Sequence, residues 1–227
     1  MDKFSRREFF YLSASLSLIF PLHAYAMNGE NNKPKNDYPN TILLLKQAFN
    51  TEMIAHEHYL GYVEKALAEK YPNISYMFYA FSFSEKIHAD NYKNIISKLG
   101  GKIEKAVLPI DVLDTKSNLQ KAAEKELEKI EKFYPKLLQN LEPESCEEAI
   151  INCMYSLKSH RQHEEKAREI KRYSGLFFGS VASHIEEMNL DFHVCKICGS
   201  TIDKVPELPC EICNRSVSHY KKINRPV

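Results

Sequence analysis

Two pairs of cysteines near the carboxyl end of the chain could hold a metal ion. They form two C-x2-C motifs with eleven residues between them, Cys195 with Cys198 and Cys210 with Cys213. Paired knuckles of this kind present four thiolates in a tetrahedron, and both iron and zinc accept such a site. About thirty residues cannot build a core that folds alone, so the metal must hold this segment together. Disulfide bonds in an oxidising compartment are a third alternative.

The residues around these pairs and the other two cysteines support a metal site. Gly199 and Asn214 directly follow the two pairs, where left-handed backbone is commonly needed. Cys146 and Cys153 lie seven residues apart on one expected helix. Their Cα atoms would be ~10 Å apart at a rise of ~1.5 Å per residue, too far for a disulfide bond. We therefore expect them to be small buried hydrophobic residues.

Glutamate and histidine residues form a second group that could bind metal. Four stretches carry apolar residues at spacings of three and four, typical of amphipathic helices, and each apolar face includes Glu or His near its middle. Ionisable side chains rarely enter a core unless they are paired or bound to metal. Residues three apart share one face of a helix, so two of the stretches each direct two donors inward. The six residues are Glu52, Glu85, His88, Glu126, His160 and His163.

The elements that must position these donors are four long helices within residues 39–172. Short connections after the first and third helices predict two antiparallel hairpins, and the segment from 100 to about 115 predicts a longer crossover. Hairpin, crossover and hairpin is the topology of an all-α ferritin-like four-helix bundle. Residues 173–191 are expected to form a linker helix, and residues 192–227 the small cysteine domain.

The segments that carry the donors resemble the rubrerythrin family. They are Leu-Leu-Lys-Gln-Ala-Phe-Asn-Thr-Glu at 44–52, Glu-Lys-Ile-His-Ala at 85–89, Asn118-Leu119 leading to Glu126, Tyr134-Pro135, and Pro-Glu-Leu-Pro at 206–209. The resemblance extends from about residue 40 to 220. It implies a ferritin-like bundle that holds two irons, a rubredoxin-like domain that holds a third, and reduction of hydrogen peroxide to water.

The resemblance also implies roles for individual residues. Iron-ligand positions match Glu52, Glu85, His88, Glu126 and His163. Tyr59 and Tyr134 match tyrosines beside the iron site, where their hydroxyls could orient ligand carboxylates; core packing is the alternative. His56 lies one turn after Glu52 and is either an extra ligand or a core histidine.

Two positions depart from the family pattern. The fourth helix of the family reads Glu-x-x-His, whereas this chain has His160-x-x-His163, so an imidazole replaces a carboxylate that could bridge two metals. The third helix usually carries a further glutamate where this chain has Lys129. That lysine either extends its ammonium to solvent or turns inward to pair with Glu126.

Charge decides what these departures imply for metal binding. Two ferrous ions bring four positive charges against three glutamates, whereas one divalent ion together with an inward Lys129 balances them. Uncompensated charge in a bundle core is costly. We therefore expect a second bundle metal to bind more weakly than in the family, or a single-metal site.

The amino-terminal 26 residues resemble a twin-arginine signal peptide. Arg6-Arg7 precedes an apolar run of about a dozen residues, too short for a spanning helix of ~20, and Ala24-Tyr25-Ala26 offers a cleavage site. An uncleaved membrane anchor is the alternative. This route exports folded proteins, so we expect a periplasmic protein loaded with metal in the cytoplasm. Residues 27–38 are polar and are expected to be a flexible lead-in.

Composition limits the remaining function classes. The 31 basic and 30 acidic residues fall to 28 of each once residues 1–26 are removed, so the chain lacks the charge of a nucleic-acid binder. The leading hypothesis is an oxidoreductase that reduces hydrogen peroxide at the bundle with electrons from a four-cysteine iron. It would act as a head-to-tail homodimer with an unidentified electron donor and no membrane span after cleavage. The alternatives are a structural protein with zinc at the cysteines, and a ferritin-like oxidase or iron-handling protein.

Overall fold

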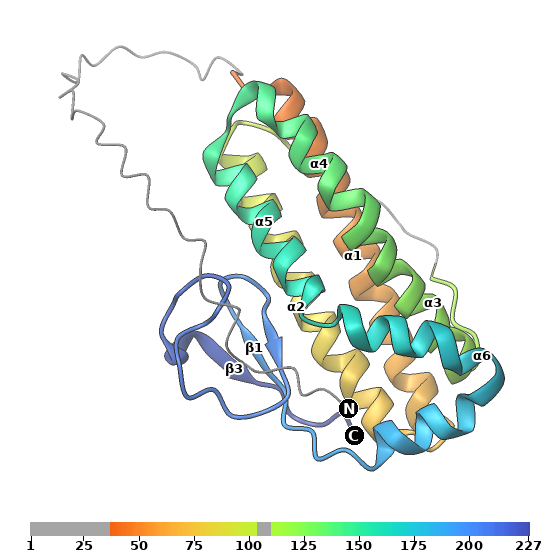
Figure 1. Ribbon diagram of the computed structural model, residues 1–227. Coiled ribbons are helices and arrows are strands. Elements are labelled where there is room, and N and C mark those ends of the chain that lie inside the picture. Colours follow the sequence, from red (N-terminus) through yellow and green to blue (C-terminus); the bar gives the residue numbers. More distant parts are fainter. Residues whose placement is uncertain (1–36, 104–109) are drawn as a thin grey trace, which may run out of the picture. The chain divides into compact units, whose positions relative to one another are not determined.

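The computed structural model describes residues 37–103 and 110–227, and its helices form the expected bundle (Figure 1). The signal sequence expected at 1–26 and most of the lead-in lie outside the described residues. Helix α1 spans Pro39–Ala68 and α2 spans Pro72–Lys98. Each begins with proline, whose missing N–H costs nothing in the first helical turn. The three residues between them force an antiparallel hairpin, as predicted.

The second half of the bundle is less regular. Helix α3 spans Thr115–Glu128 and passes through a π-helical turn, Lys129–Phe133, into α4 at Tyr134–Leu141. A short 3-10 turn, Glu142–Glu144, leads to α5 at Glu147–Arg161. Asp114 caps α3 by accepting a hydrogen bond from the N–H of Ser117 at 2.9 Å. The crossover before α3 returns over α1, where Val112 lies against Gly61 so closely that a Cβ there would meet it at 2.6 Å.

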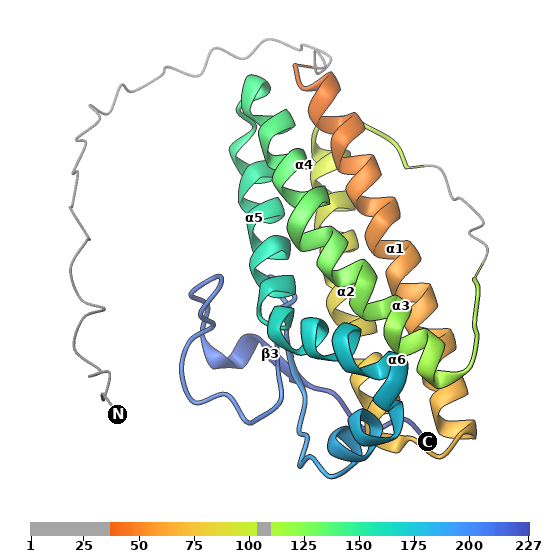
Figure 2. The ribbon, with the colours of Figure 1, turned by 45° about the vertical axis from the view of Figure 1, so that its right-hand side comes forward.

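The fourth helix ends earlier than the sequence indicates. Its apolar stripe continues to Ile170, but α5 stops at Arg161 and α6 begins at Glu164. Helix α6 then runs to Glu186, through the boundary expected between bundle and linker helix at 172 and 173. In Figures 1 and 2, α6 turns away from the direction of α5. Of the residues described, no helix is long and apolar enough to span a membrane.

The carboxy-terminal domain is a three-stranded antiparallel sheet attached to α2. Strands β1 (His193–Cys195), β2 (Thr201–Ile202) and β3 (Tyr220–Lys222) lie in the order β2-β1-β3, and a 3-10 turn at Val217–His219 precedes β3. The buried Tyr76 of α2 joins both ends of this domain. Its hydroxyl donates to the carbonyl of Ile223 at 2.6 Å and accepts from the N–H of Phe192 at 3.0 Å. These two hydrogen bonds fasten the beginning and the end of the small domain to the bundle.

Candidate metal centres

The four cysteines of the small domain form a site for one tetrahedral ion. The Sγ atoms of Cys195 and Cys213 are 3.7 Å apart, and those of Cys198 and Cys210 are 3.5 Å apart. A tetrahedron with metal–sulfur bonds of about 2.3 Å has edges of about 3.8 Å, so these positions fit iron or zinc.

The turns that close the two knuckles have the predicted backbone. Gly199 has φ +77° and Asn214 has φ +54°, both in the left-handed region. At Gly199 the lack of a side chain is also needed for space, because a Cβ would lie 2.3 Å from Nε2 of His88.

The second centre lies inside the bundle, where three helices direct four donors to one point. Glu52 comes from α1, Glu85 and His88 from α2, and His160 from α5. One ligand atom from each lies within 4.8 Å of all the others, and all four residues are buried. Glu126 of α3 is also buried and borders the group through His160. Five of the six donors expected from the sequence thus lie together in the bundle; whether they bind metal stays a prediction.

The spacing of the four inner atoms fits one ion. Nε2 of His160 is 3.4 Å from Oε1 of Glu52 and 3.8 Å from Oε2 of Glu85. Nδ1 of His88 is 3.3 Å from the same Oε2. Metal bonds of about 2.1 Å to nitrogen and oxygen give a tetrahedron with edges of about 3.4 Å. Two carboxylates and two imidazoles are a donor set that iron or zinc accepts.

Hydrogen bonds on the far side of each imidazole orient its ring. Nε2 of His88 lies 3.1 Å from the carbonyl oxygen of Cys198, and Nδ1 of His160 lies 2.6 Å from Oε2 of Glu126. When these nitrogens donate, the lone pair on each opposite nitrogen faces the centre. Burial and the charge of His160 lower the pKa of His88 to about 3, which keeps His88 neutral.

Lys129 turns inward, which decides between the two orientations left open by the sequence. Its Nζ lies 2.6 Å from Oε2 of Glu52, 3.0 Å from Oε1 of Glu85 and 3.8 Å from Oε1 of Glu126. Burial alone would lower the pKa of Lys129, but the three carboxylates raise it above its ordinary value, so the ammonium stays charged. The partners are mainly Glu52 and Glu85 rather than the expected Glu126.

The buried charges balance each other without any metal. Burial opposes ionisation of Glu52 and Glu126, yet the charges of Lys129 and His160 hold both carboxyl pKa values below the ordinary range. Burial and the nearby Glu52 carboxylate raise the pKa of Glu85 well above that range. Burial alone would lower the pKa of His160, but the nearby carboxylates, chiefly that of Glu126, outweigh it and raise the pKa to about 10. Two cations therefore face two anions and a protonated carboxyl group.

Two tyrosines donate hydrogen bonds to carboxylates of the bundle, as the resemblance suggested. The hydroxyl of Tyr59 donates to Oε1 of Glu126 at 2.5 Å, and that of Tyr134 donates to Oε1 of Glu52. The π turn places Tyr134, because the N–H of Tyr134 bonds to the carbonyl of Lys129 five residues back. In a regular helix, with about 100° per residue, the side chains of Lys129 and Tyr134 would point about 140° apart. The wider π turn directs both of them into the bundle.

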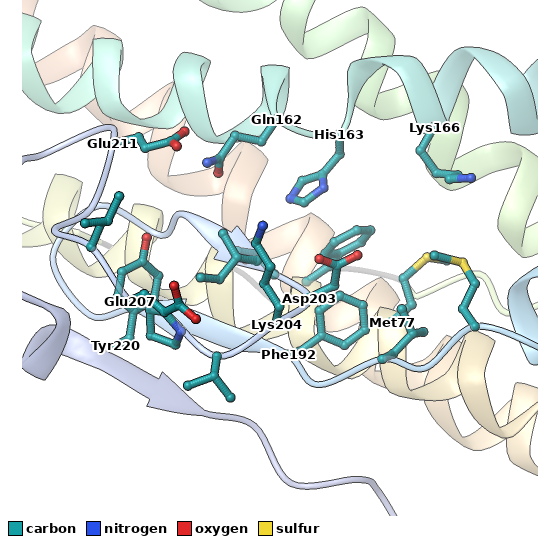
Figure 3. A pocket seen from close by; sticks show the side chains of 18 of the residues that line it. Met77, Gln162, His163, Lys166, Phe192, Asp203, Lys204, Glu207, Glu211 and Tyr220 are labelled. Atoms are coloured by element: carbon teal, nitrogen blue, oxygen red, sulfur yellow. The ribbon is translucent and has the colours of Figure 1, made fainter.

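Two candidate ligands lie outside the cluster. His163 precedes α6, and its ring packs against Phe81 with 4.7 Å between centroids. His163 lines a cavity of about 730 Å³ together with Lys166, Asp203 and other residues. Figure 3 shows its ring directed towards these side chains. Burial lowers its pKa to about 4. The break after Arg161 turns His163 away from the face that carries His160. His56 instead bonds through Nδ1 to the carbonyl of Ser82 at 2.8 Å.

Sequence reasoning missed the residues that fasten the first knuckle to the bundle. Oγ of Ser84 and Oγ of Ser159 donate to the carbonyl of Gly199 at 2.6 Å and 3.0 Å. Nδ2 of Asn91 donates to the carbonyl of Ile197 at 2.8 Å. Ser84, His88 and Asn91 are spaced by four and three, so all lie on one face of α2. That polar stripe was the available signal.

A helical bundle with an inward carboxylate–imidazole centre and a four-cysteine domain defines a ferritin-like metalloprotein with two metal sites. The rubrerythrin family model matches residues 44–171, which is more than half of the chain. The chain therefore belongs to the rubrerythrin family. Rubrerythrin-2 of Clostridium acetobutylicum is 29% identical over 178 residues, covering 74% of this chain and 89% of that protein.

Other comparisons agree. Rubrerythrin-1 of the same organism is 26% identical over 183 residues, covering 78% of this chain and 91% of that protein. Solved structures of nigerythrin in a mixed-valence state and in a fully reduced, all-ferrous state each superpose with a TM-score of 0.69 at 20% identity. They cover 89% and 90% of this chain and all of the nigerythrin chains. This likeness confirms the predicted fold, a ferritin-like bundle with a rubredoxin-like domain.

Proposed function

We propose that this chain reduces hydrogen peroxide to water, with electrons that enter at a four-cysteine iron and pass to an iron in the bundle. Family membership and two sites of suitable donor chemistry support the proposal. Each turnover breaks the O–O bond of one peroxide and consumes two electrons and two protons to give two waters. Iron held by the four cysteines and iron held by the bundle donors would each supply one electron of that pair, and an external one-electron donor would restore both.

The observation that carries the proposal is the direct link through His88. One ring nitrogen of His88 faces the bundle donors, and the other bonds to the carbonyl of Cys198, which is one of the four cysteines of the small domain. Ser84, Ser159 and Asn91 hold the same knuckle against α2 and α5. An electron leaving the cysteine site thus meets a bonded route into the bundle rather than a gap of solvent.

The protein's own groups hold protons beside the bundle centre and fix the orientation of its carboxylates. Bound iron supplies the one-electron redox chemistry, which no side chain here can provide. Burial and the nearby Glu126 raise the pKa of Tyr59, and burial and Glu52 raise that of Tyr134, so both hydroxyls keep their protons beside the centre. The carboxylates that accept from them remain fixed in orientation.

Export and assembly remain part of the proposal. The twin-arginine resemblance of residues 1–26 supports a periplasmic location, and the family resemblance supports a homodimer. In the family the partner's rubredoxin-like domain approaches the bundle centre. In this chain His88 contacts the carbonyl of Cys198 of the same chain, which supports electron transfer within one protomer as well. The electron donor is a further protein or small molecule of suitable potential.

Reoxidation of the reduced protein tests the function. The iron-loaded protein should be red, lose its colour with a reductant, and regain it within seconds when hydrogen peroxide is added under anaerobic conditions. His88→Ala should slow the return of colour, whereas His58→Ala, which changes a histidine of α1 outside the cluster, should not. Reduced protein that stays colourless for minutes with peroxide would end the peroxidase proposal.

The inward Lys129 favours one alternative, a structural protein with zinc at the cysteines and no turnover. The bundle network is already charge-balanced by Lys129 and His160, so the fold does not require a bundle metal. Under this alternative the purified protein is colourless and contains about one zinc per chain. Metal analysis with a visible spectrum separates the two functions in one measurement.

A further inference from the structure

We propose that the ammonium of Lys129 takes the place of a second metal ion, so that the bundle holds a centre of one metal ion and one lysine bridged by two carboxylates. The two carboxylates are those of Glu52 and Glu85. In each carboxylate, one oxygen faces the proposed metal position and the other accepts a hydrogen bond from Lys129. Oε1 of Glu52 and Oε2 of Glu85 face the histidines, while Oε2 of Glu52 and Oε1 of Glu85 accept from Lys129.

The metal position lies on the histidine side. Three of the six separations among the two facing oxygens and the inner nitrogens of His88 and His160 are 3.3, 3.4 and 3.8 Å, near the edge expected for one four-coordinate ion. The outer nitrogens of both rings already have acceptors, the carbonyl of Cys198 and the carboxylate of Glu126. The ligands are thus held in place before an ion binds.

Charge favours one ion at this site. A divalent ion and an ammonium together balance the three buried carboxylates of Glu52, Glu85 and Glu126. Two divalent ions beside the same ammonium would leave two uncompensated positive charges in the core, which is strongly unfavourable. The donor set for a second ion is incomplete as well, since His163 packs against Phe81 outside the cluster.

Displacement of the lysine is the competing arrangement, and the structure offers a route for it. Lys129 lines a cavity of about 310 Å³ between α1 and α3, together with residues such as Tyr59 and Phe133. An incoming second ion could send the ammonium into that cavity. The two arrangements differ in the number of metal ions per chain, which can be counted.

Iron stoichiometry of the full chain tests the proposal independently of turnover. After anaerobic loading with excess ferrous iron and desalting, we expect about two irons per chain, one at the cysteines and one in the bundle. The Mössbauer spectrum should lack the signature of a coupled iron pair. Lys129→Glu combined with His160→Glu should raise the count to about three and introduce that signature. Three irons in the wild-type protein, or only one, would overturn the proposal.

A matched pair of histidine variants tests the ligand set even if the double variant fails to fold. His160→Ala should lose the bundle iron and keep the cysteine iron, lowering the count from about two to about one. His163→Ala removes the same group three residues later and should leave the count unchanged. Loss of iron from His163→Ala but not from His160→Ala would contradict the assigned centre. The iron count does not depend on peroxide. The single-ion centre can therefore be refuted while peroxide reduction is confirmed, and peroxide reduction can be refuted while the single-ion centre is confirmed.

Discussion

Replacement of Lys129 by methionine should destabilise the protein far more than loss of any surface lysine. The ammonium contacts Glu52, Glu85 and Glu126, and its side chain is only 6% exposed. Methionine keeps most of the volume and removes the charge. Breaking a buried ion pair by removing one partner costs about 3–5 kcal/mol, because the remaining charge is left uncompensated.

The expected shift in melting temperature follows from this magnitude. For a protein of this size, 1 kcal/mol corresponds to roughly 2–4 °C, so Lys129→Met should melt about 6–20 °C below the wild type. Circular dichroism of both proteins with matched metal content measures the difference. Lys125→Met is the control, since Lys125 lies on α3, its side chain is 65% exposed and it pairs with Glu128 on the surface. Such surface pairs contribute about 0–1 kcal/mol.

Partial rescue would identify the cause. Adding Glu52→Gln to Lys129→Met removes one of the carboxylates that the lysine neutralised. The melting temperature of the double variant should therefore fall by less than the sum of the decreases in the two single variants. The reasoning is refuted if Lys129→Met melts within a few degrees of Lys125→Met. In that case Lys129 would make no net contribution to the folded state and would not serve as a structural cation.

Four further predictions concern other parts of the two centres. Gly199→Ala should detach the first knuckle from His88 and slow reoxidation by peroxide, because the new Cβ would lie 2.3 Å from Nε2 of His88. Asn214→Gly should be tolerated, because glycine readily adopts the positive φ of that position. Tyr134→Phe should cost about 1–3 kcal/mol in urea unfolding, since the buried Glu52 carboxylate loses a donor. Removing the cysteine-bound metal with a chelator should unfold residues 192–227 while amide exchange in α1 stays slow. In the protein without bundle metal, the free energy of unfolding should fall as pH rises from 6.5 towards 10, by at most about 1.4 kcal/mol per pH unit. The reason is that the folded protein holds the His160 proton to about pH 10, whereas the unfolded chain releases it near pH 6.5. His160→Gln should flatten this part of the plot of stability against pH.

The sequence was informative about the centres where chemistry limits the choice of residue. Ionisable residues on an apolar helical stripe have few explanations, so Glu52, Glu85, His88 and Glu126 could be assigned to one level of the bundle. The cysteine pairs were similarly restricted by thiolate geometry. The tyrosine hydrogen bonds followed from the same resemblance and are present at Tyr59 and Tyr134.

Features that depend on local breaks in the helices were not predictable. His163 continues the spacing of the fourth stripe, yet the helix ends at Arg161 and the ring turns to Phe81. Hydrogen bonds such as the one from Ser200 Oγ to Gln162 at 3.0 Å come from residues distant in the chain. The direction of Lys129 was undecided for the same reason, because a π turn that starts at that residue has no simple sequence signature.

The two departures from the family pattern make physical sense together rather than separately. Histidine at 160 removes one carboxylate, and lysine at 129 removes another and adds a positive charge. With both present, the remaining three carboxylates are balanced by one divalent ion and the ammonium. If only position 160 were returned to glutamate, Lys129 would face an additional carboxylate, and the core would need another cation or proton. If only position 129 were returned to glutamate, the core would have room for a second ion, but His160 could not bridge the two ions as a carboxylate does. The contact of His160 with Glu126 at 2.6 Å and the contacts of Lys129 with Glu52 and Glu85 therefore form one charge-balanced unit. A bundle core tolerates this unit because each buried charge has a partner within hydrogen-bonding distance.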